Sequence, residues 1–208
     1  MKGSKIEEDS MRIIEEEIGD LKNNYKPKEW LIVRRVIHTT ADYDFADKNR
    51  LVFNNAIDAA FKAINARCNI VCDTDIVYAG LNKKNLNNLG LRCISRISDE
   101  DVIREAKKSN KTRAETAMRL SANEIRDGIV AIGNAPTALL EVLRLIDEGI
   151  KPALIIAVPV GFVNAKESKD MLMQYNIPYI TNIGRKGGST VASAILNALM
   201  LLYIKDRL

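Results

Sequence analysis

Short, largely apolar runs alternate with amphipathic segments along most of this chain, and this alternation limits its possible folds more than any other feature. Five such runs lie at residues 69–77, 91–95, 128–132, 153–158 and 179–183. Strands that are apolar on both sides are buried on both faces, which is typical of parallel sheets. The segments between them must then be helices that cover the two faces. The sequence therefore predicts an α/β fold, a three-layer α/β/α sandwich with a mainly parallel five-stranded sheet.

The intervening segments have helical spacing. Residues 48–67 place Val52, Ala56, Ala60 and Ile64 on one face, and residues 136–148 begin with Pro and end before Gly149, as helices commonly do. A further apolar, β-branched run at residues 30–37 is also interpreted as a strand, which ends at the polar residues that follow it.

The length of 208 residues and the 47% hydrophobic content suit one sizeable core, so we expect a single domain over residues 1–208. Residues 1–27 are predicted to form an amphipathic helix and a linker that pack on the α/β core. The apolar runs are too short or too interrupted to span a bilayer, and the acidic N-terminal segment does not resemble an export signal. We therefore expect no membrane association and a cytoplasmic location.

The three cysteines make an odd number in a chain without an export signal, which favours reduced thiols over disulfides. Cys68 and Cys72 have no second pair of ligands nearby, so no metal site is predicted. The net charge of +4 is spread over 31 basic and 27 acidic residues. Without a dense basic run, nucleic acid is not an expected partner, whereas a small ligand with several carboxylates is compatible with this charge.

Ligands of parallel α/β sheets bind beyond the carboxyl ends of the strands, and this rule directs attention to the segments that follow each strand. His38 follows the run at 30–37 and is the only histidine of the chain. Any imidazole acid–base chemistry must therefore use it. The alternative is that His38 only caps a strand or donates a hydrogen bond to a carbonyl.

The segment 184–190 joins a predicted strand to a predicted helix and contains two adjacent glycines and two cations. Glycines let the backbone approach a ligand, and the amides of a helix N-terminus bind anions. The alternative is that this segment is only a tight turn, which requires its glycines for steric reasons. Arg113 could clamp a carboxylate or remain a solvated helix cation, and Ser10 marks either a ligand contact or a close helix contact.

Several segments in collinear order carry a resemblance to one family. They are Arg35-Val36-Ile37-His38-Thr39-Thr40-Ala41-Asp42, Thr112-Arg113-Ala114, Gly133-Asn134-Ala135-Pro136-Thr137-Ala138-Leu139, Pro159-Val160-Gly161-Phe162-Val163, Glu167-Ser168-Lys169 and Gly184-Arg185-Lys186-Gly187-Gly188-Ser189. From about Ser10 to Leu199, the chain resembles the precorrin-8X methylmutases, a family that includes the cobalt-precorrin-8 methylmutases of cobalamin biosynthesis.

The resemblance implies a flavodoxin-like, cofactor-free isomerase that acts as a homodimer, with its sites near the subunit interface. The implied reaction moves a methyl group from C11 to C12 of a polycarboxylated corrin precursor, precorrin-8 or its cobalt form, to give hydrogenobyrinate or cobyrinate. His38 matches the catalytic histidine. The predicted substrate-binding residues are Ser10, Thr39, Arg113, Asn134, Arg185, Lys186, Gly187, Gly188 and Ser189.

Two other functions stay open at this point. A non-catalytic corrinoid carrier would use the same pocket, with His38 as a cobalt ligand or as a support for the ring. A nucleotide- or phosphate-binding enzyme would use the turn at Gly187-Gly188-Ser189, although neither a Walker A sequence nor a dinucleotide fingerprint is present in the chain.

Overall fold

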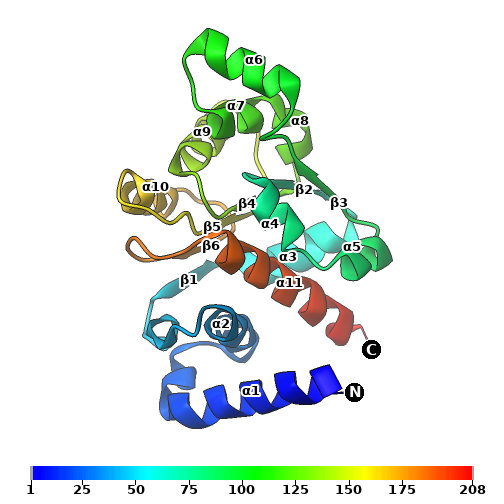
Figure 1. Cartoon of the computed structure of the whole chain (residues 1–208), viewed down its shortest axis with the longest axis vertical. Helices are drawn as coiled ribbons and strands as arrows, with labels where there is room; N and C mark the ends of the chain where they lie inside the picture. Colours follow the sequence, from blue (N-terminus) through cyan, green and yellow to red (C-terminus); the bar gives the residue numbers. More distant parts are fainter. Residues whose placement is uncertain (1, 208) are drawn as a thin grey trace.

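The computed structural model describes residues 2–207 and contains a six-stranded sheet with helices on both faces (Figure 1). Its strands are β1 (Leu51–Asn54), β2 (Asn69–Cys72), β3 (Arg92–Ser95), β4 (Ile129–Ile132), β5 (Leu154–Ala157) and β6 (Tyr179–Asn182), in the spatial order β1-β6-β5-β4-β2-β3. All neighbours pair in parallel except β1, which runs antiparallel to β6. The order β3-β2-β4-β5-β6 is the flavodoxin-like order 2-1-3-4-5. The predicted fold class is confirmed, with six strands rather than five.

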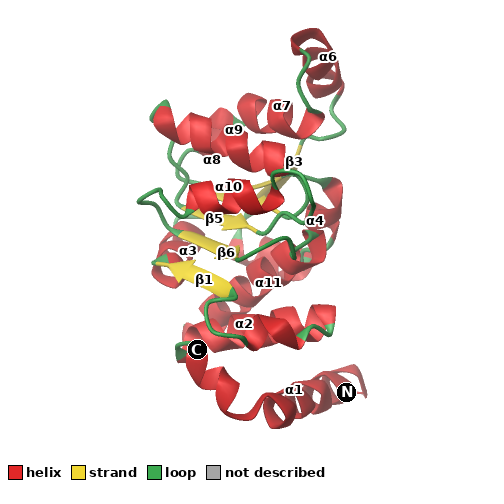
Figure 2. Ribbon diagram, turned by 90° about the vertical axis from the view of Figure 1, so that its left-hand side faces the viewer, coloured by secondary structure: helices red, strands yellow, loops and turns green. Residues whose placement is uncertain are grey.

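Alternate residues of the central strands belong to two separate apolar clusters. In β4, Ile129 and Ala131 face one cluster, whereas Val130 and Ile132 face the other. One face is covered by α3 (Ala56–Asn65) and α11 (Ser189–Asp206), with α4 (Asp75–Ala79) and α5 (Lys83–Leu89) beside them. The other face is covered by α7 (Arg113–Leu120), α8 (Ala122–Ile125), α9 (Pro136–Asp147) and α10 (Ala165–Leu172), and α6 (Glu100–Ser109) packs on α7 (Figure 2).

An additional helical unit lies outside the sandwich, at the lower end of both views. It consists of α1 (Lys2–Ile18), η1 (Gly19–Asn24), α2 (Pro27–Thr40) and η2 (Tyr43–Ala46). Helix α2 packs on α11, and α1 packs on α2. With the sheet on one side and α2 on the other, α11 is buried along most of its length. Within residues 2–207, no helix combines the length and apolar character needed to cross a bilayer.

The prediction of a strand at residues 30–37 is wrong, because this run lies inside α2. Pro27 opens the helix at a position that proline favours, and the Glu29 carboxylate accepts a 3.1 Å hydrogen bond from the Lys26 N–H. Trp30, Val33 and Ile37 are buried at helical spacing. A short β-branched run does not distinguish strand from helix, and here packing on α11 decides the outcome.

The predicted helix at residues 48–67 is correct only in its second half. Residues 51–54 form β1, and α3 begins at Ala56 after Asn55, which has a left-handed backbone (φ 48°). Val52 and Ala56, predicted to share a helix face, therefore lie in different elements. Strand β1 is only four residues long, and α3 follows it almost at once. The apolar residue Val52 of the strand therefore matches the helical spacing of α3 by chance.

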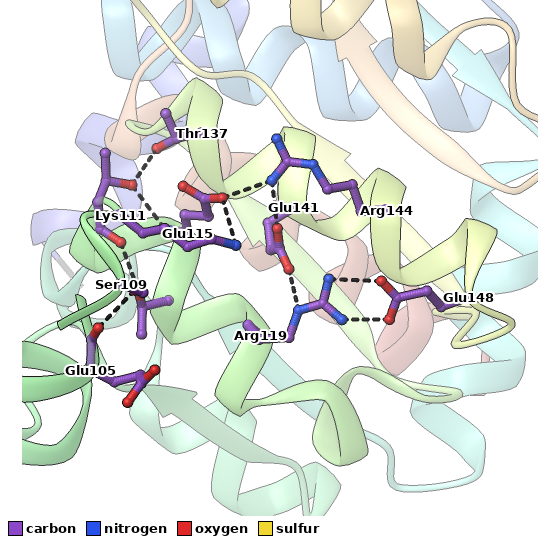
Figure 3. A network of polar contacts seen from close by, with 11 residues as sticks. Glu105, Ser109, Lys111, Glu115, Arg119, Thr137, Glu141, Arg144 and Glu148 are labelled. Carbon is purple, nitrogen blue, oxygen red and sulfur yellow. Dashed lines mark hydrogen bonds and ion pairs between the residues drawn. The ribbon is translucent and has the colours of Figure 1, made fainter. Parts of the chain in front are cut away.

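A polar network joins α7 to α9 on the face of the sheet opposite to α11 (Figure 3). The carboxylate of Glu141 is completely buried and pairs with Arg119 and, at 2.7 Å, with Arg144. Arg119 also donates to Glu148 at 2.9 Å, and Arg144 donates to Glu115 at 2.7 Å. A buried carboxylate requires such partners, and these ion pairs fix the spacing of the two helices.

Candidate functional site

The loops that follow β2, β4, β5 and β6 meet at one edge of the sheet, because these strands are parallel. The order of the strands reverses between β2 and β4, where ligands of this architecture bind. The loop after β2 carries Asp73 and Thr74, and the loop after β4 carries Gly133 and Asn134. This edge is therefore the candidate active site.

Asp73 holds the two loops at the reversal point together. Its carboxylate, which is fully buried, accepts hydrogen bonds from the backbone N–H groups of Gly133 (3.2 Å), Asn134 (2.8 Å) and Ala135 (2.8 Å). Burial raises the pKa of Asp73, and the three amide donors oppose that rise. These amides at the start of α9 are occupied by Asp73, so an incoming anion must be bound by other groups.

Close backbone contacts explain two of the glycines on this edge. A Cβ on Gly187, which has φ 144°, would lie 2.1 Å from the Val158 carbonyl oxygen. A Cβ on Gly133 would lie 2.6 Å from the Cα of Ser189. The Gly188 N–H donates to the Val158 carbonyl at 2.9 Å. The steric alternative thus accounts for Gly187, and a ligand role for Gly187, Gly188 and Ser189 stays a prediction.

His38 lies in the last turn of α2, not at the end of a strand as the sequence predicted. Helix α2 ends there because Ala41 has a left-handed backbone (φ 52°) and its N–H donates to the Ile37 carbonyl. The side chain of His38 is exposed. Its neighbour Thr39 lines a cavity of about 430 Å³ between α1, α2, α5 and α11, together with Arg35 and Asn197.

Lys186 joins the segment after His38 to the loop after β6. Its ammonium donates to Asp42 at 2.7 Å and to Asp44 at 2.6 Å. The Lys186 ammonium lowers the pKa of Asp44, and the two carboxylates raise the pKa of Lys186. The structure therefore ties the segment that follows α2 to the 184–189 loop, and Lys186 is already paired within the protein.

The neighbouring cation, Arg185, is exposed, and its guanidinium lies 5.9 Å from the centre of the Phe162 ring. Arg113 is exposed at the first position of α7. The hydroxyls of Thr112 and Thr137 lie 2.9 Å apart, which puts the start of α7 beside the start of α9 and hence near Asn134. Within residues 2–207, neither arginine forms an ion pair. Both are available to a carboxylated ligand.

Ser10 is half-buried in α1, and its hydroxyl donates to the Ile6 carbonyl at 2.8 Å. Helix α1 packs mainly on α2, so Ser10 lies on a different element from the loops described above. Its membership of one site with His38 stays a prediction.

Two residues of this edge were not identified as site residues from the sequence, Asp73 and Lys169. Lys169 is fully buried, and its ammonium donates to the Lys186 carbonyl at 2.9 Å. The sequence contains a sign of this burial, because helical spacing puts Lys169 on the same face as Ala165, Ser168 and Leu172, where an apolar residue is expected.

Possible metal ligands are dispersed over the molecule. Within the part of the chain that the structure describes, no three His, Cys, Asp or Glu side chains gather closely enough to hold an ion. Cys72 and Cys93 are free thiols whose sulfur atoms lie 3.5 Å apart on adjacent strands.

Comparisons with known proteins agree on one family. The model of the family described as precorrin-8X methylmutase matches residues 5–202. The cobalt-precorrin-8 methylmutase of Leptospira interrogans is 49% identical and covers 98% of this chain and 95% of its own length, and that of Priestia megaterium is 48% identical over 95% and 87%. A crystal structure of the precorrin-8X methylmutase of Thermus thermophilus has a TM-score of 0.90, with 39% identity over 98% of this chain and 97% of that one. This chain belongs to the precorrin-8X methylmutase family.

Proposed function

We infer that this protein is an isomerase that moves a methyl group from C11 to C12 of cobalt-precorrin-8 or precorrin-8, giving cobyrinate or hydrogenobyrinate in cobalamin biosynthesis. The observation that carries this function is the family match over residues 5–202. The only histidine lies at the end of α2, four residues before Asp42, which Lys186 of the loop after β6 binds. Relatives that are 46–49% identical are named for the cobalt form, which favours that substrate.

The reaction requires proton placement more than a nucleophile, because the methyl group migrates within the conjugated macrocycle. The exposed imidazole of His38 is accessible to a ligand, and its backbone belongs to the last turn of a packed helix. We propose that His38 donates a proton to the ring and so favours the tautomer in which the methyl group migrates. No resident cofactor forms part of this proposal.

The peripheral carboxylates of the substrate need cationic and amide donors. Arg185 and Arg113 suit this role, because both are exposed on or beside the sheet edge and have no internal carboxylate partner within residues 2–207. Lys186 reaches a substrate only in competition with Asp42 and Asp44. We propose that the remaining contacts come from Ser10, Thr39, Asn134, Gly187, Gly188 and Ser189.

We also propose that the protein is a cytoplasmic homodimer. Its three cysteines are free thiols, which suits a reducing compartment. A second copy has a surface available to it at the loop after β5, where Phe162 is 86% exposed and Val163 78% exposed. An apolar cluster of this kind is unusual on the free surface of a monomer.

The test is an absorbance-monitored assay with cobalt-precorrin-8 and with precorrin-8. The wild type should convert at least one of them, and His38→Ala should bind the substrate but lose conversion by about 100-fold or more. Lys48→Ala, an exposed position between η2 and β1, is the control and should keep wild-type turnover. Tight binding without conversion by the wild type would refute the enzyme and leave a corrinoid carrier.

A further inference from the structure

Lys169 is completely buried and, among the residues that the structure describes, has no carboxylate partner. It has no exposed surface, and on the buried face of α10 it stands where a leucine or methionine would fill the space. Its ammonium donates to two neutral oxygens, the Lys186 carbonyl at 2.9 Å and Oδ1 of Asn182 at 3.1 Å. No ion pair of Lys169 occurs within residues 2–207.

Those contacts hold one peptide group of the sheet edge. The Lys186 carbonyl also accepts a 2.6 Å hydrogen bond from Nδ2 of Asn182. The next residue, Gly187, is pressed against the Val158 carbonyl. On the outer side of the same loop, the Lys186 ammonium holds Asp42 and Asp44 of the segment after His38. The backbone between Lys186 and Gly187 is thus fixed from the inside by Lys169 and Asn182.

Withdrawing an ammonium group from water is unfavourable when only neutral acceptors replace the solvent. Burial accordingly lowers the pKa of Lys169 to about 8, and the nearby Asp170 only partly opposes this. An apolar side chain of similar volume would fill the same space without this desolvation. A lysine at this position therefore indicates a requirement other than stability.

We propose that Lys169 is a positioning residue for the reaction: by holding the Lys186 carbonyl it fixes the loop 184–189, which presents Arg185 to the substrate and links Lys186 to the segment after His38. This inference rests on the proposed function, since it assigns Lys169 a part in the same site. The residue itself acts through the loop and does not contact the substrate.

The experiment compares Lys169→Met, which keeps the length of the side chain without its donors, with Lys166→Met. Lys166 lies three residues earlier on the same helix, is exposed and pairs with Asp170, so it is a matched control. For each variant, kcat and KM for cobalt-precorrin-8, the melting temperature and the rate of trypsin cleavage after Arg185 and Lys186 are measured.

Lys169→Met should lower kcat/KM by about tenfold or more, chiefly by raising KM, because a displaced loop misplaces the substrate. Trypsin should cleave its loop faster than that of the wild type, while the melting temperature stays close to the wild-type value. Lys166→Met should match the wild type in kcat/KM, melting temperature and cleavage rate. Lys169→Arg, which keeps charge and donors, should recover part of kcat/KM. If Lys169→Met does not fold, Lys169→Leu takes its place.

Wild-type kcat/KM in the apolar variant, or a lower melting temperature with unchanged kcat/KM, would overturn the proposal and leave Lys169 a structural residue. If the wild type converts neither substrate, the proposed function itself fails. The cleavage rates then test separately whether Lys169 holds the loop 184–189, and unchanged cleavage in Lys169→Met rejects that part of the inference as well.

Discussion

Three charged side chains within residues 2–207 are completely buried, and each is bonded to a part of the chain that must stay in place. Asp73 holds the start of α9, Glu141 joins α9 to α7, and Lys169 holds the loop after β6. A buried charge is tolerated only when its hydrogen-bonding capacity is met, so each of the three specifies one local geometry.

Removing the Asp73 carboxylate should therefore destabilise the fold. Asp73→Ala leaves the amides of Gly133, Asn134 and Ala135 without their acceptor, and we expect the free energy of unfolding to fall by about 3 kcal/mol. Urea denaturation measures this change. Asp75→Ala is the control, because Asp75 is exposed and accepts only from two serine hydroxyls, and its effect should be about 1 kcal/mol or less. Equal losses in both variants would contradict the role given to Asp73.

The sequence indicates which single residues are buried, but not which groups they bind. The position of Asp73 directly after an apolar strand, and of Lys169 within the buried face of a helix, can both be read from the sequence. Their partners cannot, because the amides of residues 133–135 and the carbonyl of Lys186 are backbone groups whose location depends on the tertiary fold. For the same reason the sequence suggested Lys186 as a ligand for substrate, without indicating that Asp42 and Asp44 already bind it.

At the scale of elements, the buried strands were the easiest to predict. The predicted strands at 128–132, 153–158 and 179–183 contain β4, β5 and β6 and exceed them by one or two residues, whereas the one predicted at 69–77 contains β2 but runs on into α4. Continuous apolar runs between turn residues are a strong signal when both faces of a sheet are buried. Helix α2 was missed because it packs on α11, so its burial depends on a helix that lies far away in the sequence.

The network between α7 and α9 gives a second prediction. Arg119→Gln leaves the buried Glu141 with Arg144 as its charged partner, and the free energy of unfolding should fall by about 2 kcal/mol at neutral pH. Chemical denaturation of the variant and the wild type measures this difference. Arg126→Gln is a suitable control, since Arg126 is exposed and only reaches a carbonyl at 3.4 Å.

The difference in unfolding free energy between the wild type and Arg119→Gln should depend on pH. The hydrogen bond from Arg119 lowers the pKa of Glu148. A lowered pKa stabilises the fold above the ordinary value of 4.5, and this contribution is lost as pH falls through the lowered value. The difference between wild type and Arg119→Gln should therefore shrink in acid, and a difference that grows there would contradict this assignment.

At the scale of the whole molecule, the loop after β5 exposes the most apolar surface, at Phe162 and Val163. If a second copy covers Phe162 and Val163, Phe162→Ser should shift the protein from dimer to monomer at micromolar concentration. Light scattering coupled to size exclusion measures the mass. Met171→Ser, a less exposed apolar position on α10, is the control and should leave the mass unchanged. A wild type that is monomeric at every concentration would refute the proposed dimer.

The antiparallel direction of β1 determines at which edge of the sheet the preceding segment, which contains His38, enters. Leu51, at the start of β1, pairs with Asn182, at the end of β6, so the chain enters the sheet from the edge at which the five parallel strands finish. A first strand parallel to its neighbour would have begun at the opposite edge, and the histidine before it would have been carried away from the loops. The segment that supplies His38 is also the segment that shields α11 from water. Helix α2 therefore both carries the proposed acid–base residue and covers α11, so a change that unfolds α2 should remove both.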